Sequence, residues 1–419
     1  MPILSFSSGI ASGLPLWAGK KENGHVFLQQ AFTLNILLAA VIFLLGLALF
    51  FPLKFLGFTN LEYFSFLICA FFLILTNYFD ELFIAIGLID RGGIVLAGFE
   101  VIKAILFLLL ASQAFSINSL FIVYGGVLAL KFVTGFLLLI KEKKNQLIWI
   151  ESVKKEILTY AVPVSLSNLL SFFLDKSDQL ILSFFATKEM FAYYGIGCLI
   201  IPPLFILEQS VTKVVLPKLS THFHQFNKKE IINIYQSAVS DIALLNVPGA
   251  LGLMVFAKPI ILMLFGPRYE AAILFTRMYS LFYLTLIIPP DLLLRSSGDG
   301  KSILKLNAIF APISLFLCLS LSFFYQAYGA LVAFLIIKPI RTYFFLRKSK
   351  DLLEIPLVAL LPLRDLRRYL IISIILSAIS LFSAPYFKSD LQWFLIMGSF
   401  FFLSFVVSNL SHFKHLIRK

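Results

Sequence analysis

Residues 30–53 read QAFTLNILLAAVIFLLGLALFFPL, and no side chain in this stretch is charged. A helix needs roughly 20 mainly apolar residues to cross the hydrocarbon core of a bilayer. A helix that is apolar on all sides must be buried, either in a large protein core or in lipid. The stretch therefore predicts a transmembrane helix.

Similar apolar runs recur along the whole chain of 419 residues. Hydrophobic residues make up 60% of the chain, charged residues only 14%, and the mean hydropathy is +0.94. Soluble domains carry about a quarter charged residues. The predicted spans are 30–53, 61–88, 92–116, 118–140, 157–185, 191–216, 232–265, 271–293, 301–323, 328–347, 368–386 and 391–411. The sequence thus predicts an all-α, polytopic membrane protein with about twelve transmembrane helices and little soluble mass.

The net charge of +13 has a simpler explanation than nucleic-acid binding. If the spans alternate in direction, most Lys and Arg fall in loops on one side of the membrane. These are Lys20 and Lys21, Arg91, 141–156, 217–230, 295–301, 347–368 and the C-terminal tail. The opposite loops hold few basic residues, such as Lys54, Lys188, Arg268 and Lys388. By the positive-inside rule, the first set and the C-terminus are predicted to be cytoplasmic.

Several chemistries find no support in the sequence. Cys69, Cys198 and Cys318 all lie in apolar runs, where buried cysteines are expected rather than a disulfide or metal site. His222 and His224 have no carboxylate or cysteine at ligand spacing, so no metal site or cofactor is predicted. Residues 1–19 lack the pattern of a signal peptide.

An internal repeat divides the chain. Matching pairs recur at a nearly constant offset: Lys20-Lys21-Glu22 with Lys228-Lys229-Glu230, Phe55-Leu56-Gly57 with Leu264-Phe265-Gly266, Arg91 with Arg295, and Tyr124-Gly125 with Tyr328-Gly329. Corresponding helices then run in the same direction, as in the parallel repeats that place a transport site between two lobes. The polar stretch 141–156, KEKKNQLIWIESVKKE, is the predicted hinge. The predicted domains are an N-terminal lobe (1–145), a C-terminal lobe (146–350) and two additional C-terminal helices (351–419).

Residues 157–350 carry an ordered series of short motifs. They are YAVP at 160–163, DQLILS at 178–183, YGI at 194–196, VLPKLS at 215–220, AKPII at 257–261 and FGPRY at 265–269. This series resembles the polysaccharide flippases of the MOP superfamily, the Wzx-type O-antigen and oligosaccharide transporters. The first half of the chain shares only the weaker repeat.

The resemblance implies two six-helix lobes around a central cavity, followed by two extra helices. It also implies that polyprenyl-pyrophosphate-linked oligosaccharide is flipped across the inner membrane for surface polysaccharide, such as the O-antigen of lipopolysaccharide. The implied partners are this lipid-linked oligosaccharide, membrane lipid and polysaccharide polymerase or assembly proteins, with no nucleic acid.

Basic residues inside predicted spans are candidates for substrate binding. A charge in hydrocarbon is costly, so such residues usually face a wet cavity or a partner. Arg277 lies near the outer end of its span, while Lys131 and Lys338 lie mid-helix at repeat-related positions. Together with Lys103 they are the predicted cavity cations, because the pyrophosphate of the implied substrate is anionic.

Acidic residues inside spans are candidates for ion coupling. They are Asp80, Glu81, Glu100 and Glu208. Glu100 and Lys103 lie one turn apart, which is also the spacing of an internal ion pair.

Other charged residues have structural explanations. Asp175, Lys176 and Asp178 are expected to pair with one another near the outer end of their helix. Lys213, Asp241 and Arg341 are expected near cytoplasmic helix ends, where long side chains reach the interface.

Pro163, Pro203, Pro248 and Pro290 fall inside predicted spans. Proline removes a backbone hydrogen bond and kinks a helix. Such bends serve either as hinges for alternating access or as static packing features, and the sequence leaves both open.

Two alternative functions remain. The first is a multidrug or cation antiporter of the related extrusion branch, which Asp80 and Glu81 would suit. The second is a membrane-embedded polymerase or acyltransferase, although no catalytic cluster or nucleotide-binding loop is present in the sequence. We expect the chain not to be an enzyme.

The N-terminus departs from the repeat. The second half has the pair 157–185 and 191–216 before its Lys-Lys-Glu loop, whereas only residues 1–19 precede Lys20-Lys21-Glu22. Leu14-Pro15-Leu16 matches Leu216-Pro217-Lys218-Leu219, the end of such a pair. The expectation is an N-terminal lobe that lacks its first one to two helices, through a truncated reading frame or as a natively short family member.

Overall fold

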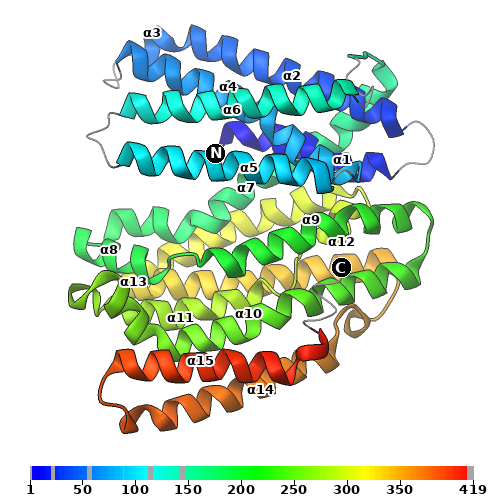
Figure 1. Ribbon diagram of the computed structural model, residues 1–419. Helices are drawn as coiled ribbons and strands as arrows, with labels where there is room; N and C mark the ends of the chain where they lie inside the picture. Colours follow the sequence, from blue (N-terminus) through cyan, green and yellow to red (C-terminus); the bar gives the residue numbers. More distant parts are fainter. Residues whose placement is uncertain are drawn as a thin grey trace. The chain divides into compact units, whose positions relative to one another are not determined.

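The computed structural model is built from α-helices (Figure 1). It describes residues 2–19, 24–53, 59–87, 89–111, 117–141 and 147–412. Within these ranges no strand is present. The predicted fold class, an all-α polytopic membrane protein, is confirmed.

Among the described residues, six helices precede the long helix α7 (Glu151–Phe185). They are α1 (Pro2–Ala18), α2 (Gly24–Ala48), the single turn α3 (Phe50–Leu53), α4 (Asn60–Ala85), α5 (Ile89–Ala111) and α6 (Ile117–Lys141). Thr59 starts α4 with a capping box, because its hydroxyl accepts from the Glu62 amide while the Glu62 carboxylate accepts from the Thr59 amide. The sequence prediction of 61–88 is therefore close to the observed α4.

The second half contains the remaining helices. They are α8 (Lys188–Gly197), α9 (Pro202–His224), α10 (Lys228–Phe265), α11 (Ala272–Thr285), α12 (Leu292–Ser296), α13 (Gly300–Leu353), α14 (Leu363–Ser383) and α15 (Asp390–Ser408). α10 packs against α11, α14 and α15. Its first turn is capped by the Asn227 side chain, which accepts a hydrogen bond from the Glu230 amide.

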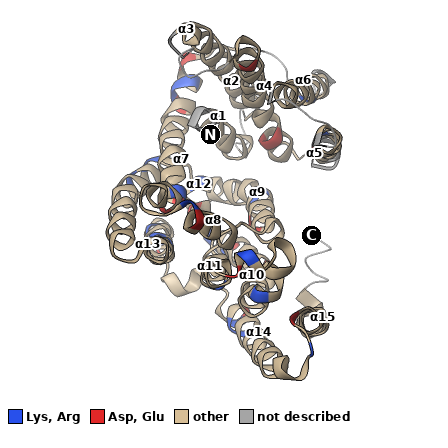
Figure 2. Ribbon diagram, turned by 90° about the vertical axis from the view of Figure 1, so that its left-hand side faces the viewer, with Lys and Arg blue, Asp and Glu red and all other residues tan. Residues whose placement is uncertain are grey.

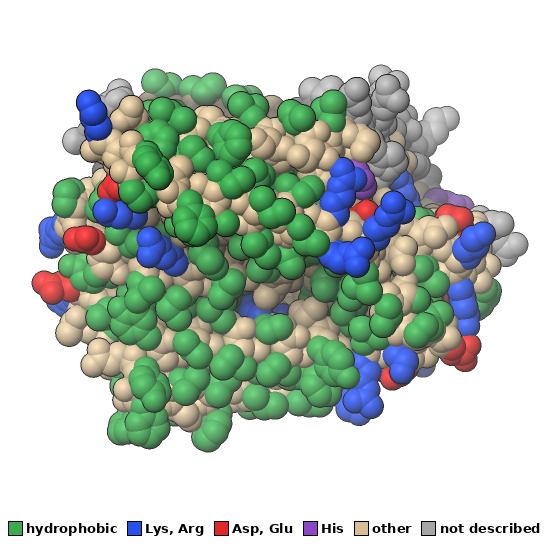
Figure 3. All heavy atoms as spheres, turned by 90° about the horizontal axis from the view of Figure 1, so that it is seen from below, with side chains coloured by type: hydrophobic (Ala, Val, Ile, Leu, Met, Phe, Trp, Pro, Cys, Tyr) green, Lys and Arg blue, Asp and Glu red, His purple; other side chains and the backbone are tan. Residues whose placement is uncertain are grey.

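Eight described helices are long and apolar enough to cross a membrane, and a ninth span results if the bent pair α8 and α9 is counted as one. Most of each helix is uncharged, as the nearly end-on view in Figure 2 shows. Hydrophobic side chains cover the middle of the face in Figure 3, and many Lys and Arg side chains lie toward its ends. This distribution is typical of a membrane protein, whose charges collect at the interfaces.

Helix α13 contains two of the predicted spans, 301–323 and 328–347. An unbroken helix of its 54 residues would be about 81 Å long. Instead the helix breaks at Gln326, which has φ 48° and ψ −127°. The Arg341 Nε lies 2.9 Å from the Asn307 Oδ1, and the rings of Phe310 and Phe344 are 5.4 Å apart. These contacts require the two arms of α13 to lie antiparallel, as the sequence predicts.

Besides 30–53, whose last residues form the separate turn α3, two predicted spans are not single helices. The stretch 191–216 is divided between α8 and α9, which meet at an angle of 55°. Pro203 lies in the first turn of α9, where proline fits because the first amides of a helix have no partner. The stretch 271–293 is also wrong as one helix, because α11 ends at Thr285 and Pro290 lies in the connection to α12.

The chain forms two compact units, each with its own contacts. Unit 1 comprises 1–169 with the short segments 216–225 and 295–304. Unit 2 comprises 170–215, 226–294 and 305–419. Unit 1 thus includes segments of the predicted C-terminal lobe. The division into an N-terminal lobe (1–145), a C-terminal lobe (146–350) and two additional helices (351–419) stays a prediction.

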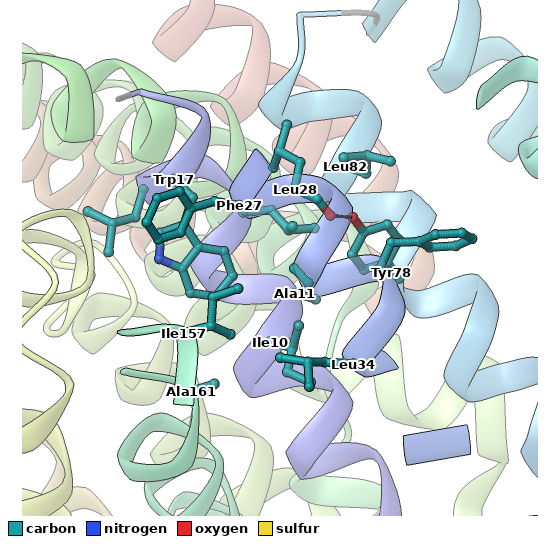
Figure 4. Close-up of a cluster of buried hydrophobic side chains, with 14 of the residues drawn as sticks. Ile10, Ala11, Trp17, Phe27, Leu28, Leu34, Tyr78, Leu82, Ile157 and Ala161 are labelled. Carbon is teal, nitrogen blue, oxygen red and sulfur yellow. Dashed lines mark hydrogen bonds between the residues drawn. The ribbon is translucent and has the colours of Figure 1, made fainter. Parts of the chain in front are cut away.

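The core of unit 1 surrounds the N-terminal helix α1 (Figure 4). Ala11, Leu14 and Trp17 of α1 are almost fully buried against residues of α2, α4 and α7. At Gly9 the helices approach so closely that a Cβ atom would lie 2.0 Å from the Ser165 Oγ. Helix α1 is therefore packed into unit 1 along the part of its length that starts at Ser7.

Several polar groups in this core are hydrogen-bonded to neighbouring helices. The Tyr78 hydroxyl donates to the Leu28 carbonyl at 2.7 Å, as Figure 4 shows. The Ser7 hydroxyl donates to the Asn35 Oδ1 at 2.9 Å, and the Asn35 Nδ2 donates to the Ile74 carbonyl at 3.2 Å. Buried polar groups without partners are costly, so these bonds fix the register of the helices.

Part of the predicted repeat and topology falls outside the described residues. This applies to Lys20-Lys21-Glu22, Lys54, Phe55-Leu56-Gly57, residues 142–146 and residues 413–419, and to the side chain of Arg91. Cys69, Cys198 and Cys318 are free and buried, as expected for small apolar residues.

Candidate functional site

One face of α7 carries a row of polar side chains. Asn168, Ser171, Asp175 and Asp178 follow one another at spacings of three and four residues, which places them on the same side of a helix. Each has a partner on another helix, and the partners of the first three are basic. The row therefore gathers charged and polar groups within helices that are otherwise apolar.

In unit 2, Lys338 of α13 forms an ion pair with Asp175 of α7. The Lys338 side chain is 15% exposed and the Asp175 side chain 48%. The Lys338 Nζ also lies 5.0 Å from the ring centre of Phe334 and 5.6 Å from that of Phe282. Aromatic faces stabilise a cation where water is scarce. The predicted cavity cation Lys338 is thus held by one carboxylate and two rings.

Arg341 lies one turn beyond Lys338 on α13. Its Nε donates to the Asn307 Oδ1 at 2.9 Å, and its terminal nitrogen donates to the Ser171 hydroxyl at 3.3 Å. The guanidinium also lies over the Phe345 ring at 5.1 Å. All three groups are neutral, so two hydrogen bonds and one cation–π contact stabilise the charge of Arg341 here. The sequence expectation of a residue that simply reaches the interface overlooked this network.

Asp178 is the most deeply buried of the acidic residues on this face. It is 3% exposed, and its Oδ2 accepts a hydrogen bond from the Tyr194 hydroxyl of α8. Its Oδ1 has no hydrogen-bond partner in the part of the chain that the structure describes. Burying an ionised carboxylate costs several kcal/mol or more unless it is compensated. Asp178 is therefore suited to hold a proton or another small cation.

The expected mutual pairing of Asp175, Lys176 and Asp178 is wrong. Asp175 contacts Lys338, Asp178 contacts Tyr194, and the Lys176 Nζ lies 3.4 Å from the Gln179 Oε1. The two carboxylates share one side of α7 but contact different neighbouring helices, while Lys176 contacts a residue of α7 itself.

In unit 1, the predicted cavity cation Lys131 of α6 pairs with Asp80 of α4. The Lys131 Nζ lies 2.8 Å from the Asp80 Oδ1, and the Lys131 side chain is only 7% exposed. Arg295 and Asn168 also meet in this unit at 3.1 Å. Lys131 and Asp80, predicted for different roles, therefore form one ion pair.

Glu100 and Lys103 form the ion pair on α5 that their spacing predicts. The Lys103 Nζ also lies 5.6 Å from the ring centre of Tyr124 on α6. The carboxylate of Glu100 is well exposed, with 58% of the side chain accessible. This pair lies on an outer part of unit 1.

Three further predicted site residues lie on other helices. Arg277 is exposed on α11, close enough to Lys258 to interact with it electrostatically, and Lys258 forms an ion pair with Asp390 at 2.8 Å. The Glu208 Oε1 of α9 accepts from the Thr212 hydroxyl at 3.3 Å. Glu81 is half-buried on α4. The predicted roles of these residues, in substrate binding for Arg277 and in ion coupling for Glu208 and Glu81, stay predictions.

The predicted hinge prolines divide into two pairs. Pro163 and Pro248 lie inside the continuous helices α7 and α10. Pro203 and Pro290 lie where a predicted span is broken. The Tyr235 hydroxyl donates to the Pro289 carbonyl at 3.3 Å, which satisfies a group exposed by the second break.

Metal binding has little basis in the described ranges, where no group of three His, Cys, Asp or Glu side chains is placed to hold an ion. The ring of His224 is engaged otherwise, with its Nε2 3.1 Å from the Leu16 carbonyl oxygen.

Residues 94–274 match the family described as "Polysaccharide biosynthesis protein". No curated protein sequence matches the chain.

The fold is that of MATE transporters. A multidrug resistance MATE family transporter of the MOP superfamily, in an outward-facing conformation, has a TM-score of 0.70 and 12% identity, with 84% of this chain and 85% of that chain covered. A MOP superfamily transporter from Pyrococcus furiosus, described as having reverse polarity of its binding pocket, has a TM-score of 0.69 and 13% identity over the same shares. A Vibrio cholerae MATE transporter in the bent form has a TM-score of 0.63 and 15% identity, with 84% of each chain covered. At this identity the likeness shows the fold alone.

Proposed function

We propose that this chain, a membrane transporter that joins a polysaccharide-biosynthesis region to the MOP-superfamily fold, flips polyprenyl-pyrophosphate-linked oligosaccharide across the membrane. The family match over 94–274 supports a role in polysaccharide biosynthesis. The fold supports transport. The class of the cargo rests on the charges along α7 and α13.

The observation that carries the proposal is the setting of Lys338 and Arg341. Both cations lie on one arm of α13, one turn apart, among carboxylate, amide, hydroxyl and aromatic groups. Arg fits the oxygens of a phosphate in a fork, and Lys supplies a point charge. A pyrophosphate would replace Asp175 as the partner of Lys338, and the half-exposed Asp175 would turn to water.

Lys131 would act in the same way in unit 1, with Asp80 as its resting partner. An ion pair that opens for the substrate keeps each lysine neutralised in the empty transporter. This limits the cost of holding a charge in the membrane. The exposed Arg277 would meet the substrate near the outer side.

Energy for the cycle would come from an ion gradient. Asp178, with one carboxylate oxygen bonded to Tyr194, is our candidate coupling group beside Asp80, Glu81, Glu100 and Glu208. We place the protein in the inner membrane with a cytoplasmic C-terminus. Polysaccharide polymerase or assembly proteins would receive the product on the opposite side of this membrane. Its role is transport rather than catalysis.

A multidrug or cation antiporter is the second candidate. The solved relatives include multidrug resistance transporters, and a buried acid such as Asp178 would suit a cationic drug. The excess of Lys and Arg in the helices favours an anionic cargo instead. The first candidate predicts that the protein transports an anionic substrate, and the second predicts a cationic one.

The test is deletion of the gene in its host, followed by analysis of lipid-linked repeat units. We expect these units to accumulate on the cytoplasmic side and surface polysaccharide to fall, with restoration by the wild-type gene. Unchanged polysaccharide together with increased sensitivity to cationic drugs would establish the antiporter instead.

A further inference from the structure

A cavity of about 500 Å³ lies in unit 1, away from the polar face of α7 described above. It lies among the end of α1, the first turns of α7, the end of α9 and the loop before α13. Its volume falls within the range of small-molecule pockets, about 300–1,000 Å³. The contact of His224 with the Leu16 carbonyl holds two of its walls together.

The rim of the cavity carries charges of both signs. Lys155 and Lys301 are exposed basic residues, and Glu156 and Asp299 are acidic. The formal charges of these four side chains cancel. A ligand with two or more negative charges and no positive one would therefore gain little here, whereas a ligand with one charge of each sign matches the rim.

The floor of the cavity is apolar and aromatic. Trp17 and Tyr160 are buried there with ring centres 6.0 Å apart, next to Leu16. Tyr160 lies only a turn after the start of the predicted span 157–185, so the cavity is at the level of a membrane interface. Trp and Tyr are enriched at this level, where an apolar body meets a polar surface.

We propose that this cavity binds the phosphoethanolamine headgroup of a membrane phospholipid. The phosphate would lie against Lys155 and Lys301, and the primary ammonium against Glu156 and Asp299. The glycerol would lie on the apolar floor and the acyl chains would extend into the bilayer. Nothing in the inference depends on the identity of the transported substrate.

The test uses the full chain in detergent with Trp17 as the reporter. Trp149 and Trp393 are replaced by Phe, which leaves Trp17 as the single tryptophan of the three. Short-chain phosphatidylethanolamine is titrated against fluorescence. Phosphatidylcholine, whose trimethylated ammonium cannot donate a hydrogen bond, and anionic phosphatidylglycerol are titrated in parallel.

We expect a saturable change with phosphatidylethanolamine and binding about tenfold weaker for each of the other lipids, the loss expected for one charge-assisted hydrogen bond. Lys155→Ala with Lys301→Ala should weaken binding by at least about tenfold. Lys154→Ala is the matched control, because Lys154 lies on the same turn but pairs with Glu151 and does not line the cavity.

Three results would overturn the inference. One is equal affinity for all three lipids, which would mean recognition of acyl chains alone. Another is preferential binding of phosphatidylglycerol, or displacement of the lipid by inorganic phosphate, since either would mark an anion site. The third is the absence of a saturable change in a protein whose thermal transition matches that of the wild type.

Discussion

Asp175 of α7 neutralises Lys338 of α13, while Asp80 of α4 neutralises Lys131 of α6. The two lysines occupy repeat-related positions about 207 residues apart, but their partners come from helices that do not correspond. The repeat therefore preserves a lysine in each half and pairs it with a different neighbour. Each pair is expected to respond to mutation in its own way.

Lys338→Ala should lower transport by at least about tenfold, because the loss of one charge-assisted phosphate contact is worth that factor. Lys338→Arg should keep part of the activity. Transport of lipid-linked oligosaccharide into vesicles is the measurement. Asp175→Asn is the comparison: it frees the lysine and should leave substrate affinity equal or higher. If the alanine variant transports normally at wild-type membrane levels, Lys338 does not contact the substrate.

Lys131→Ala should destabilise the protein by about 1–3 kcal/mol, because Asp80 loses its partner in a largely buried setting. The double variant Lys131→Met with Asp80→Leu should recover much of this loss, since no unpaired charge remains. Thermal unfolding in detergent reports both effects. A double variant as unstable as the single one would contradict the pairing. The double variant should nevertheless transport poorly, because it lacks the cation proposed to bind the substrate.

Arg277→Ala should lower transport strongly, and Arg277→Lys should retain part of it, because the charge survives while the fork geometry does not. Arg277 is exposed on α11, so neither change should affect folding. Arg268→Ala is the control, since Arg268 is also an exposed arginine near the same end of unit 2. If Arg277→Ala, Arg277→Lys and Arg268→Ala all transport at the wild-type rate, Arg277 does not lie in the substrate path.

Asp178→Asn should abolish the dependence of transport on an imposed proton or cation gradient. The amide keeps the shape of the carboxyl group but cannot exchange a proton. Tyr194→Phe removes the hydroxyl that bonds to Asp178 and should shift the pH profile of transport without abolishing it. Vesicles with and without a gradient provide the readout. Gradient-dependent transport by the Asn variant would exclude Asp178 as the coupling group.

Ile148→Cys should be protected from an impermeant thiol reagent in intact cells, and Arg268→Cys should be labelled. The native cysteines are buried, so they give little background. Permeabilised cells serve as the control for the accessibility of position 148. Labelling at 148 in intact cells would reverse the predicted orientation.

Hydropathy predicted most of the helices because lipid requires long apolar segments whatever their neighbours. It could not predict the breaks near Pro203 and Pro290, where neighbouring helices supply partners such as the Tyr235 hydroxyl for freed backbone groups. It did separate the two arms of α13, because Gln326 lies between two apolar runs that are each long enough to span the membrane.

The charged groups of the site were found, but their partners were not. Lys338 and Lys131 stood out as charges within apolar spans. Asp175 lies 163 residues from Lys338, a distance over which one sequence carries no pairing information. The spacing of Ser171, Asp175 and Asp178 did contain a usable signal, since it marks one polar side of an apolar helix.

The reversal at Gln326 has a consequence for how the protein is made. With no loop at the tip, neither arm of α13 has slack to enter the bilayer alone, so the two arms should insert as a hairpin during synthesis. A positive φ is unfavourable for glutamine and free of strain for glycine. Gln326→Gly should therefore favour correct insertion, whereas a proline there would delay it. The backbone conformation at Gln326 should thus influence how efficiently the two arms of α13 enter the membrane.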